Sequence, residues 1–254
     1  MLGLSSDLMH VDYHGEPKHS ISFPTAAAYL DTGNTYQSTI RDSFTISFWG
    51  KIVNGTYGGS FFGTREGLQD GIICMHLTST DKLRFGLEGY GGDAVIADTD
   101  AAVFNALNVW KHITITVTKN PGANTGVLFY VNGSVVASTN LIELAENRHS
   151  NYTNEFNFYI GGINDSDTLL TNSLIGNVDE FAIWDVALDA PAVAAVYNSG
   201  ATFDLTGASG NYDNEGDLVG YWRMNEGSGT TAVDVGGSND ATLTGGAVYS
   251  DDNV

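Results

Sequence analysis

Short segments in which apolar and polar side chains alternate recur along most of the chain, and they constrain the fold more than any other feature. In Ser43–Val53, phenylalanine and isoleucine alternate with serine and threonine, and Trp110–Lys119 repeats the pattern. A period of two places successive side chains on opposite faces of a strand, so each segment is expected to have one buried and one solvent-exposed face. His112, which alternates with Ile113, is expected on the exposed face. About a dozen such strands and one short helix predict an all-β fold, a two-sheet antiparallel β-sandwich.

Turn signals separate these segments. Asn132-Gly133 lies between two apolar runs, and this dipeptide is preferred in the type I′ turn of a β-hairpin. The 31 glycines suit a fold with many tight turns. A chain of 254 residues is long enough for a sizeable core, and a sandwich of this length can form one domain.

The charge balance excludes one class of function. The chain has 10 Lys and Arg against 30 Asp and Glu, a net charge of −20. A nucleic-acid-binding protein needs a basic surface that displaces counterions, so we expect no nucleic acid partner. The acidity indicates either solubility through repulsion between copies or the binding of cations by some of the carboxylates.

The sequence also carries expectations about location. No apolar run approaches the roughly 18 residues that a membrane-spanning helix needs, so no membrane insertion is expected. Residues 1–20 lack the basic and apolar regions of a signal peptide. The single cysteine, Cys74, lies in an apolar run and is expected to be a buried thiol, so there is no internal disulfide. These features predict a protein that assembles in a reducing cytosol.

Residues 1–19 form a polar segment without clear periodicity, ahead of a domain that spans residues 20–254. Such a segment has too little apolar area to order itself, because fixing each residue costs about 1–2 kcal/mol of backbone entropy. We therefore predict a docking arm that is ordered by contact with a partner. The side chains able to make these contacts are Leu2, Leu4, Leu8, Met9 and Tyr13.

Two stretches near the C-terminus carry the most specific patterns. Ile175–Gly200 reads as a strand followed by a short helix, with Asp189 as N-cap and Gly200 as the closing residue. It contains G-x-V-D-E-F-x-I-W-x-x-A-L, and Leu218–Gly246 contains G-Y-W-x-x-N-E-G-S-G-T…D…G-x-x-N-D. Together they resemble the laminin-G-like, concanavalin A-like family. This resemblance implies a jelly-roll fold and leaves the function open, because the fold hosts lectins, enzymes and structural modules.

The order of these stretches differs from that of many relatives, in which the second stretch opens the domain. Here it comes last, while Ser20–Phe23 begins the body of the domain. We favour a circularly permuted order in which strands within 218–250 complete the sandwich. Two alternatives remain: residues 218–254 begin an incomplete second repeat, or they reach across to a neighbouring copy as in a domain swap.

Asp179 is the main candidate for a metal site. Counted along its strand, it shares a face with Phe181 and Ile183, and a carboxylate on a core face needs a partner. The family resemblance implies a calcium ion held by this aspartate together with oxygens of the turn at Asp234–Asp240. The predicted ligands are Asp179, Asp234, Asn239 and Asp240. The alternative is that Asp179 caps backbone N–H groups without a metal.

Two loops carry aromatic residues beside glycine. Tyr57 and Tyr90 are candidate sugar-binding residues, and they suit contacts between subunits equally well. Phe61 and Phe62 lie between turn signals and are expected in the core or in an interface. Glycosidases of this fold place carboxylates on one strand in an E-x-D-x-E pattern. That pattern is absent from the sequence, so we expect no enzyme.

Three functions follow from these observations. The spacer N-S-G-x-x-x-D-L after the helix, followed by G-Y-W-R-M, resembles modules in structural proteins of tailed, notably marine, bacteriophages. The first prediction is therefore a non-enzymatic virion structural protein on the head or tail, assembled in the host cytoplasm and displayed on the virion surface. It would contact other virion proteins or copies of itself, and would display its jelly roll to host-surface glycans. The alternatives are a glycan-binding module of a secreted or surface protein, and a polysaccharide-active enzyme.

Overall fold

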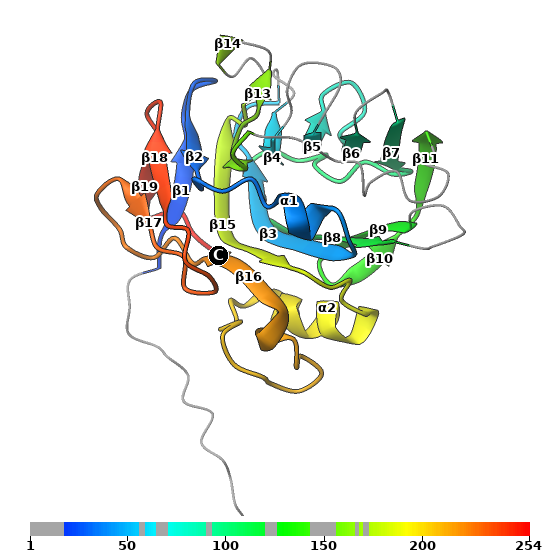
Figure 1. Cartoon of the computed structure of the whole chain (residues 1–254). Coiled ribbons are helices and arrows are strands. Elements are labelled where there is room, and N and C mark those ends of the chain that lie inside the picture. Colours follow the sequence, from blue (N-terminus) through cyan, green and yellow to red (C-terminus); the bar gives the residue numbers. More distant parts are fainter. Residues whose placement is uncertain are drawn as a thin grey trace, which may run out of the picture.

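The computed structural model describes residues 18–55, 59–64, 71–89, 93–119, 126–142, 156–165, 168–169 and 173–254. Two antiparallel sheets lie face to face, as the sequence pattern predicts (Figure 1). In order across the sheet, sheet A contains β10 (Ser134–Val136), β9 (Gly126–Val131), β8 (Lys111–Thr118), β3 (Phe44–Ile52), β15 (Gly176–Trp184), β1 (Ser20–Phe23) and β19 (Val248–Ser250), and β16 (Leu218–Trp222) also pairs with β15.

Sheet B forms the second layer of the sandwich. In order across the sheet, it contains β11 (Ser138–Ile142), β7 (Asp93–Thr99), β6 (Lys82–Gly89), β5 (Gly71–Leu77), β4 (Ser60–Gly63), β12 (Tyr159–Ile160), β2 (Tyr29–Asp31), β18 (Ala241–Thr244) and β17 (Thr231–Ala232). Within the described residues, the short strands β13 (Asn164–Asp165) and β14 (Thr168–Leu169) pair with each other and with no other strand. In the described part of the chain, no helix is long and apolar enough to cross a membrane.

The core between the sheets is built from the apolar side chains of the alternating strands. Phe48 of β3 stacks on Phe181 of β15 with ring centroids 5.6 Å apart. Phe61 and Phe62 are both fully buried in this cluster, so their assignment to the core is confirmed. Asn132 and Gly133 take left-handed backbone angles between β9 and β10, which is the conformation that the type I′ turn requires.

Helix α2 (Ala190–Tyr197) covers part of the outer face of sheet A (Figure 1). Its first turn is capped as expected, because the Asp189 carboxylate accepts a hydrogen bond from the Ala192 N–H at 2.9 Å. Asn198 rather than Gly200 provides the left-handed C-cap residue. Val193 packs with Trp184 and Tyr221 in a second apolar cluster, outside the sandwich core. The remaining helical elements are α1 (Gln37–Ile40) and the 3-10 turns η2 (Asn198–Gly200) and η3 (Glu215–Asp217).

The cover over sheet A corrects one sequence expectation. His112 lies on the outer face as predicted, yet it is buried, because Trp49 and Tyr197 of α2 pack against its ring. Burial lowers the pKa of His112 to about 3. Thr45 and Ser47 of β3 are buried on the same face. Alternation therefore predicted the direction of these side chains correctly and their exposure wrongly.

The last strands of the chain belong to the same sandwich as the first. β19 pairs with β1, with Ile21 opposite Tyr249, and β18 pairs with β2, with Leu30 opposite Leu243. Residues 218–250 thus add strands to both sheets of their own chain. That this strand order is circularly permuted relative to other members of the family stays a prediction.

Candidate functional site

Several predicted site residues lie outside the described residues. These are the two loop tyrosines, Tyr57 and Tyr90, and the five apolar residues of the arm, Leu2, Leu4, Leu8, Met9 and Tyr13. Their roles in ligand binding and docking stay predictions. The described part of the chain offers four places for a site: a bulge in β15, a turn before β18, a cavity at one edge of the sandwich, and the outer face of sheet B.

The bulge in β15 places Asp179 on the outer face of sheet A. Glu180 takes a left-handed backbone angle of φ 49°, and the register with β3 shifts between Asp179 and Ala182. Asp179 therefore lies opposite Trp49, an outer-face residue, while Phe181 points into the core. The expectation that Asp179 shares a face with Phe181 and Ile183 is wrong, because the extra residue of the bulge reverses the alternation.

The two carboxylates of the bulge are buried, with 1% of Asp179 and 7% of Glu180 exposed. Asp179 Oδ1 accepts a hydrogen bond from the Glu180 N–H at 2.9 Å, and the Val254 N–H also donates to this carboxylate. The Tyr221 hydroxyl donates to Glu180 Oε2. Burial raises the pKa of Asp179, with a further contribution from the Glu180 charge, and burial raises the pKa of Glu180 to about 7.

The turn before β18 is organised by Asp234. Its carboxylate accepts four backbone hydrogen bonds at 2.8–3.1 Å, from Tyr221, Gly236, Gly237 and Asn239. Asp240 Oδ1 accepts a further bond from the Asp234 N–H at 3.0 Å, and the Asn239 carbonyl accepts from the Trp222 indole. The Tyr221 and Trp222 bonds fasten the turn to β16.

These contacts do not fit a calcium cage at the turn, because oxygens that would face the cation already accept N–H donors. Among the described residues there is also no group of three or more His, Cys, Asp or Glu side chains placed to hold a metal ion. Calcium at Asp179, Asp234, Asn239 and Asp240 stays a prediction that the hydrogen-bond pattern does not support.

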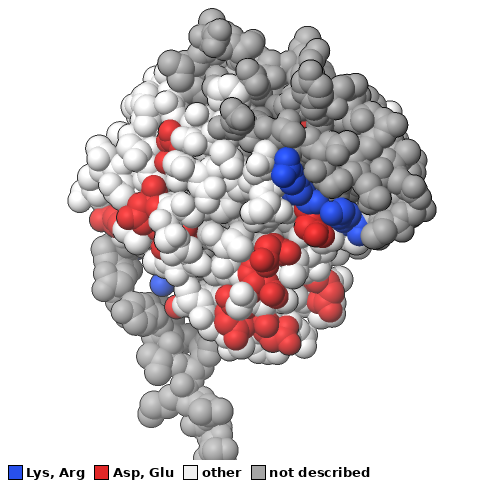
Figure 2. All heavy atoms as spheres, viewed as in Figure 1, with Lys and Arg blue, Asp and Glu red and all other residues white. Residues whose placement is uncertain are grey.

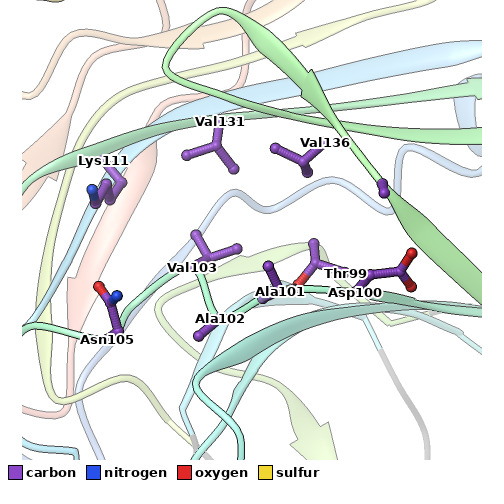
Figure 3. A pocket seen from close by; sticks show the side chains of 10 residues that line it. Thr99, Asp100, Ala101, Ala102, Val103, Asn105, Lys111, Val131 and Val136 are labelled. Atoms are coloured by element: carbon purple, nitrogen blue, oxygen red, sulfur yellow. Dashed lines mark hydrogen bonds between the residues drawn. The ribbon is translucent and has the colours of Figure 1, made fainter.

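A cavity of about 240 Å³ lies at the edge of the sandwich, between the β9–β10 hairpin and the segment after β7. Val131 and Val136 face Val103 across it, with Lys111 and Asp100 on opposite sides (Figure 3). Asp100 accepts a hydrogen bond from the Thr139 hydroxyl at 2.7 Å. This apolar lining with one carboxylate lacks the second carboxylate that glycoside hydrolysis requires.

The outer face of sheet B carries two tyrosines side by side. Tyr29 of β2 and Tyr159 of β12 meet edge to face, with ring centroids 5.3 Å apart and planes at 89°. Both side chains are half-buried, and the Tyr29 hydroxyl is hydrogen-bonded to Thr244 of β18. The core residues Leu30 and Ile160 lie opposite each other in the same two strands, so the tyrosines point outward.

Polar groups surround this aromatic pair. Asp31 lies directly opposite Tyr159 on one side and Thr242 of β18 on the other. Asp31 Oδ1 accepts hydrogen bonds from the Gly33 N–H at 2.8 Å and from the Asn157 side-chain amide at 2.9 Å. We call this set the tyrosine surface; it consists of Tyr29, Asp31, Asn157, Tyr159, Thr242 and Thr244.

Sequence reasoning missed the tyrosine surface. The alternation in 28–31 and in 156–160 would have placed Tyr29 and Tyr159 outward, opposite their apolar neighbours. Nothing in the sequence indicates that β2 pairs with β12, since 130 residues separate the two tyrosines. Only this pairing brings the two rings and Asp31 together.

Comparisons with known proteins agree with this architecture. A family model described as the concanavalin A-like lectin/glucanases superfamily matches residues 24–194. No curated protein matches the sequence. Among solved structures, a candidate carbohydrate-binding protein from Bacteroides ovatus has a TM-score of 0.61 at 17% identity, over 93% of this chain and 60% of that one. The chain thus spans 60% of the length of that protein.

Two further structures show the same fold. The CBM40 of the Ruminococcus gnavus IT-sialidase has a TM-score of 0.55 at 16% identity, over 72% of this chain and 95% of that one. That CBM40 is also known bound to alpha2,3 sialyllactose. The heptameric SAP-like pentraxin from Limulus polyphemus has a TM-score of 0.53 at 15% identity, over 92% of this chain and 94% of that one.

Proposed function

The chain belongs to the concanavalin A-like lectin/glucanase superfamily, and from this premise we propose that it is a non-enzymatic module that binds glycans on the outer face of sheet B. The observation that carries the proposal is the tyrosine surface. Sugar rings have apolar C–H faces that pack on aromatic side chains, and hydroxyl rims that need hydrogen-bond partners. Tyr29 and Tyr159 supply the aromatic contacts, and Asp31, Asn157 and Thr244 supply the polar groups.

Two observations support a binding role rather than catalysis. Asp179 and Glu180, the described carboxylates whose pKa values burial raises, lie buried on the outer face of sheet A and are out of reach of a polysaccharide. Asp31, the carboxylate of the tyrosine surface, has no second carboxylate in its set. Hydrolysis of a glycosidic bond needs two carboxyl groups about 5–10 Å apart.

The test is a glycan microarray followed by titration calorimetry on the strongest ligand. A Tyr29→Ala/Tyr159→Ala double variant should bind at least about tenfold more weakly, a loss of about 1.4 kcal/mol, because it removes both aromatic contacts. Leu128→Ala is the matched control, since it removes a half-exposed apolar side chain from the outer face of sheet A. Equal affinity in the wild type and the double variant would overturn the proposal.

A second proposal concerns the larger assembly to which this module belongs. The resemblance of the segment at 198–205 and of G-Y-W-R-M to phage modules supports a virion structural protein on the particle surface, assembled in the host cytoplasm with other virion proteins or copies of itself. Mass spectrometry of purified particles should then detect the chain at structural stoichiometry. A version lacking residues 1–19 should fold and fail to incorporate. If the version that lacks residues 1–19 incorporates normally, the arm has no docking role.

A further inference from the structure

The tyrosine surface contains one carboxylate, Asp31, and no Lys, Arg or His of the described residues forms an ion pair with it. Arg84, which also lies in sheet B, is held by Asp98 through two hydrogen bonds of 2.7 and 2.9 Å. A ligand that packs on Tyr29 and Tyr159 therefore meets an unbalanced negative charge.

Asp31 has acceptor capacity to spare. The two hydrogen bonds that it accepts from described residues both go to Oδ1, from Gly33 and Asn157. Oδ2 has no donor among the described residues, and a carboxylate oxygen can accept two hydrogen bonds. Hydroxyl groups of a sugar are donors of the required kind, and a hydrogen bond to an ionised acceptor is about twice as strong as one between neutral groups.

The charge of Asp31 reaches both aromatic rings. Burial is the larger cause of the raised pKa of Tyr29 and of Tyr159, and the charge of Asp31 raises both further.

The rest of the molecule adds charge of the same sign, with 30 acidic against 10 basic residues. Acidic side chains also predominate on the described surface in the view of Figure 2, where they gather near α2 and the loop that follows it. Asp185, Asp189, Asp204, Asp213 and Glu215 are exposed in this region.

We propose, resting on the function proposed above, that the tyrosine surface binds neutral glycans and excludes sialylated and sulfated ones, because Asp31 accepts ligand hydroxyls through Oδ2 and repels ligand anions. This distinguishes the chain from the CBM40 that has been solved with a sialylated ligand. Like charges placed against each other across an interface oppose binding, so electrostatic complementarity sets specificity here.

The experiment uses matched glycan pairs on the full chain. Neutral oligosaccharides, such as lactose, N-acetyllactosamine and mannobiose, are titrated beside their sialylated or sulfated counterparts at low ionic strength. We expect the neutral member of each bound pair to bind about tenfold or more tightly. Raising the salt concentration should narrow this ratio, because screening weakens the repulsion.

Asp31→Asn tests the role of the carboxylate directly. The variant keeps an oxygen for the Gly33 and Asn157 bonds and removes the charge. It should weaken the binding of the neutral glycan several-fold and bring the ratio between neutral and anionic ligands close to one. Asp185→Asn removes the same charge from an exposed position after β15 and should change neither quantity.

The outcomes separate the two proposals. Sialylated or sulfated ligands that bind as tightly as neutral ones, with the binding lost in Tyr29→Ala/Tyr159→Ala, would overturn the neutral preference and leave glycan binding intact. A preference that Asp31→Asn does not alter would also overturn it. Binding that ignores the two tyrosines, or no binding to any glycan, would overturn the proposed function itself.

Discussion

The outer faces of the two sheets are built from the same kind of alternating strand, and they differ in how far other parts of the chain cover them. On sheet A, the outward side chains of β3, β15 and β16 are covered by α2, by the loop at 201–217 and by the last residues of the chain (Figure 1). On sheet B, the outward side chains of β2, β12 and β18 remain partly exposed and form the tyrosine surface. Polar residues on the first face hold the structure together, whereas on the second they are available to a ligand.

The covered face shows what polar residues do when water is removed from them. Ser47 is hydrogen-bonded to His112 at 2.9 Å and to Thr114 at 3.0 Å. Lys51, only 1% exposed, pairs with Asp252 and lies 4.9 Å from the ring centre of Trp110. A buried polar group without a partner would cost about 1–3 kcal/mol, so these contacts are a condition of closing the face.

The largest expected effect comes from a pair of alanine substitutions, one on each face. Trp184→Ala should lower the free energy of unfolding by about 3–5 kcal/mol, because it empties a fully buried site and removes the hydrogen bond to the Tyr212 hydroxyl. Tyr159→Ala should cost about 1 kcal/mol, since its ring is half-exposed and loses one edge-to-face contact. Chemical denaturation measures both, and similar losses would refute the distinction between a structural and a binding face.

The pH dependence of stability gives the next largest effect. Burial raises the pKa of Glu180 to about 7 in the folded protein, while the unfolded chain titrates near 4.5. Between these values the folded state holds the extra proton, so stability is full below pH 4.5 and falls as the pH rises to about 7. Glu180→Gln lacks this group, and its free energy of unfolding should gain about 2–3 kcal/mol relative to the wild type across that window.

The quantity to measure is the difference in the free energy of unfolding between the wild type and Glu180→Gln, because the ionisation of His112 changes stability in the opposite direction. Its pKa of about 3 lies below the unfolded value of 6.5, so its contribution is lost as the pH falls. His112 is present in both proteins and cancels in the comparison. The Glu180 charge also helps to raise the pKa of Asp179, so the difference reports the two carboxylates together. A difference that stays constant from pH 4.5 to 7 would mean that Glu180 is ionised throughout, and that its environment is more polar than the buried face implies.

A smaller effect is expected at the turn that fastens β16, the strand that carries Tyr221 of the covered face. Asp234→Ala removes the acceptor of four backbone N–H groups and should cost about 2 kcal/mol. The same variant tests calcium. If the turn is held by hydrogen bonds alone, the loss measured by thermal unfolding is equal in calcium and in EDTA. A larger loss of stability in calcium than in EDTA would support a calcium site that includes Asp234.

Much of the fold could be predicted from the sequence because it depends on local patterns. Alternation predicted the strands and the buried Phe48, and Asn132-Gly133 predicted the hairpin. Asp189 predicted the start of α2. Each of these depends on the intrinsic geometry of a few neighbouring residues, which is why the class of fold needed no tertiary information.

The candidate site depended on information of another kind. Alternation shows that Ser47, His112 and Tyr159 point away from the core, and it does not show what covers them. The packing of α2 decided that Ser47 and His112 are buried, and the pairing of β2 with β12 decided that Tyr159 meets Tyr29 and Asp31. A single bulge at Glu180 reversed the predicted face of Asp179. The sequence by itself determined which residues form strands. Contacts between residues far apart in the chain determined which polar face is covered and which stays exposed as the proposed binding surface.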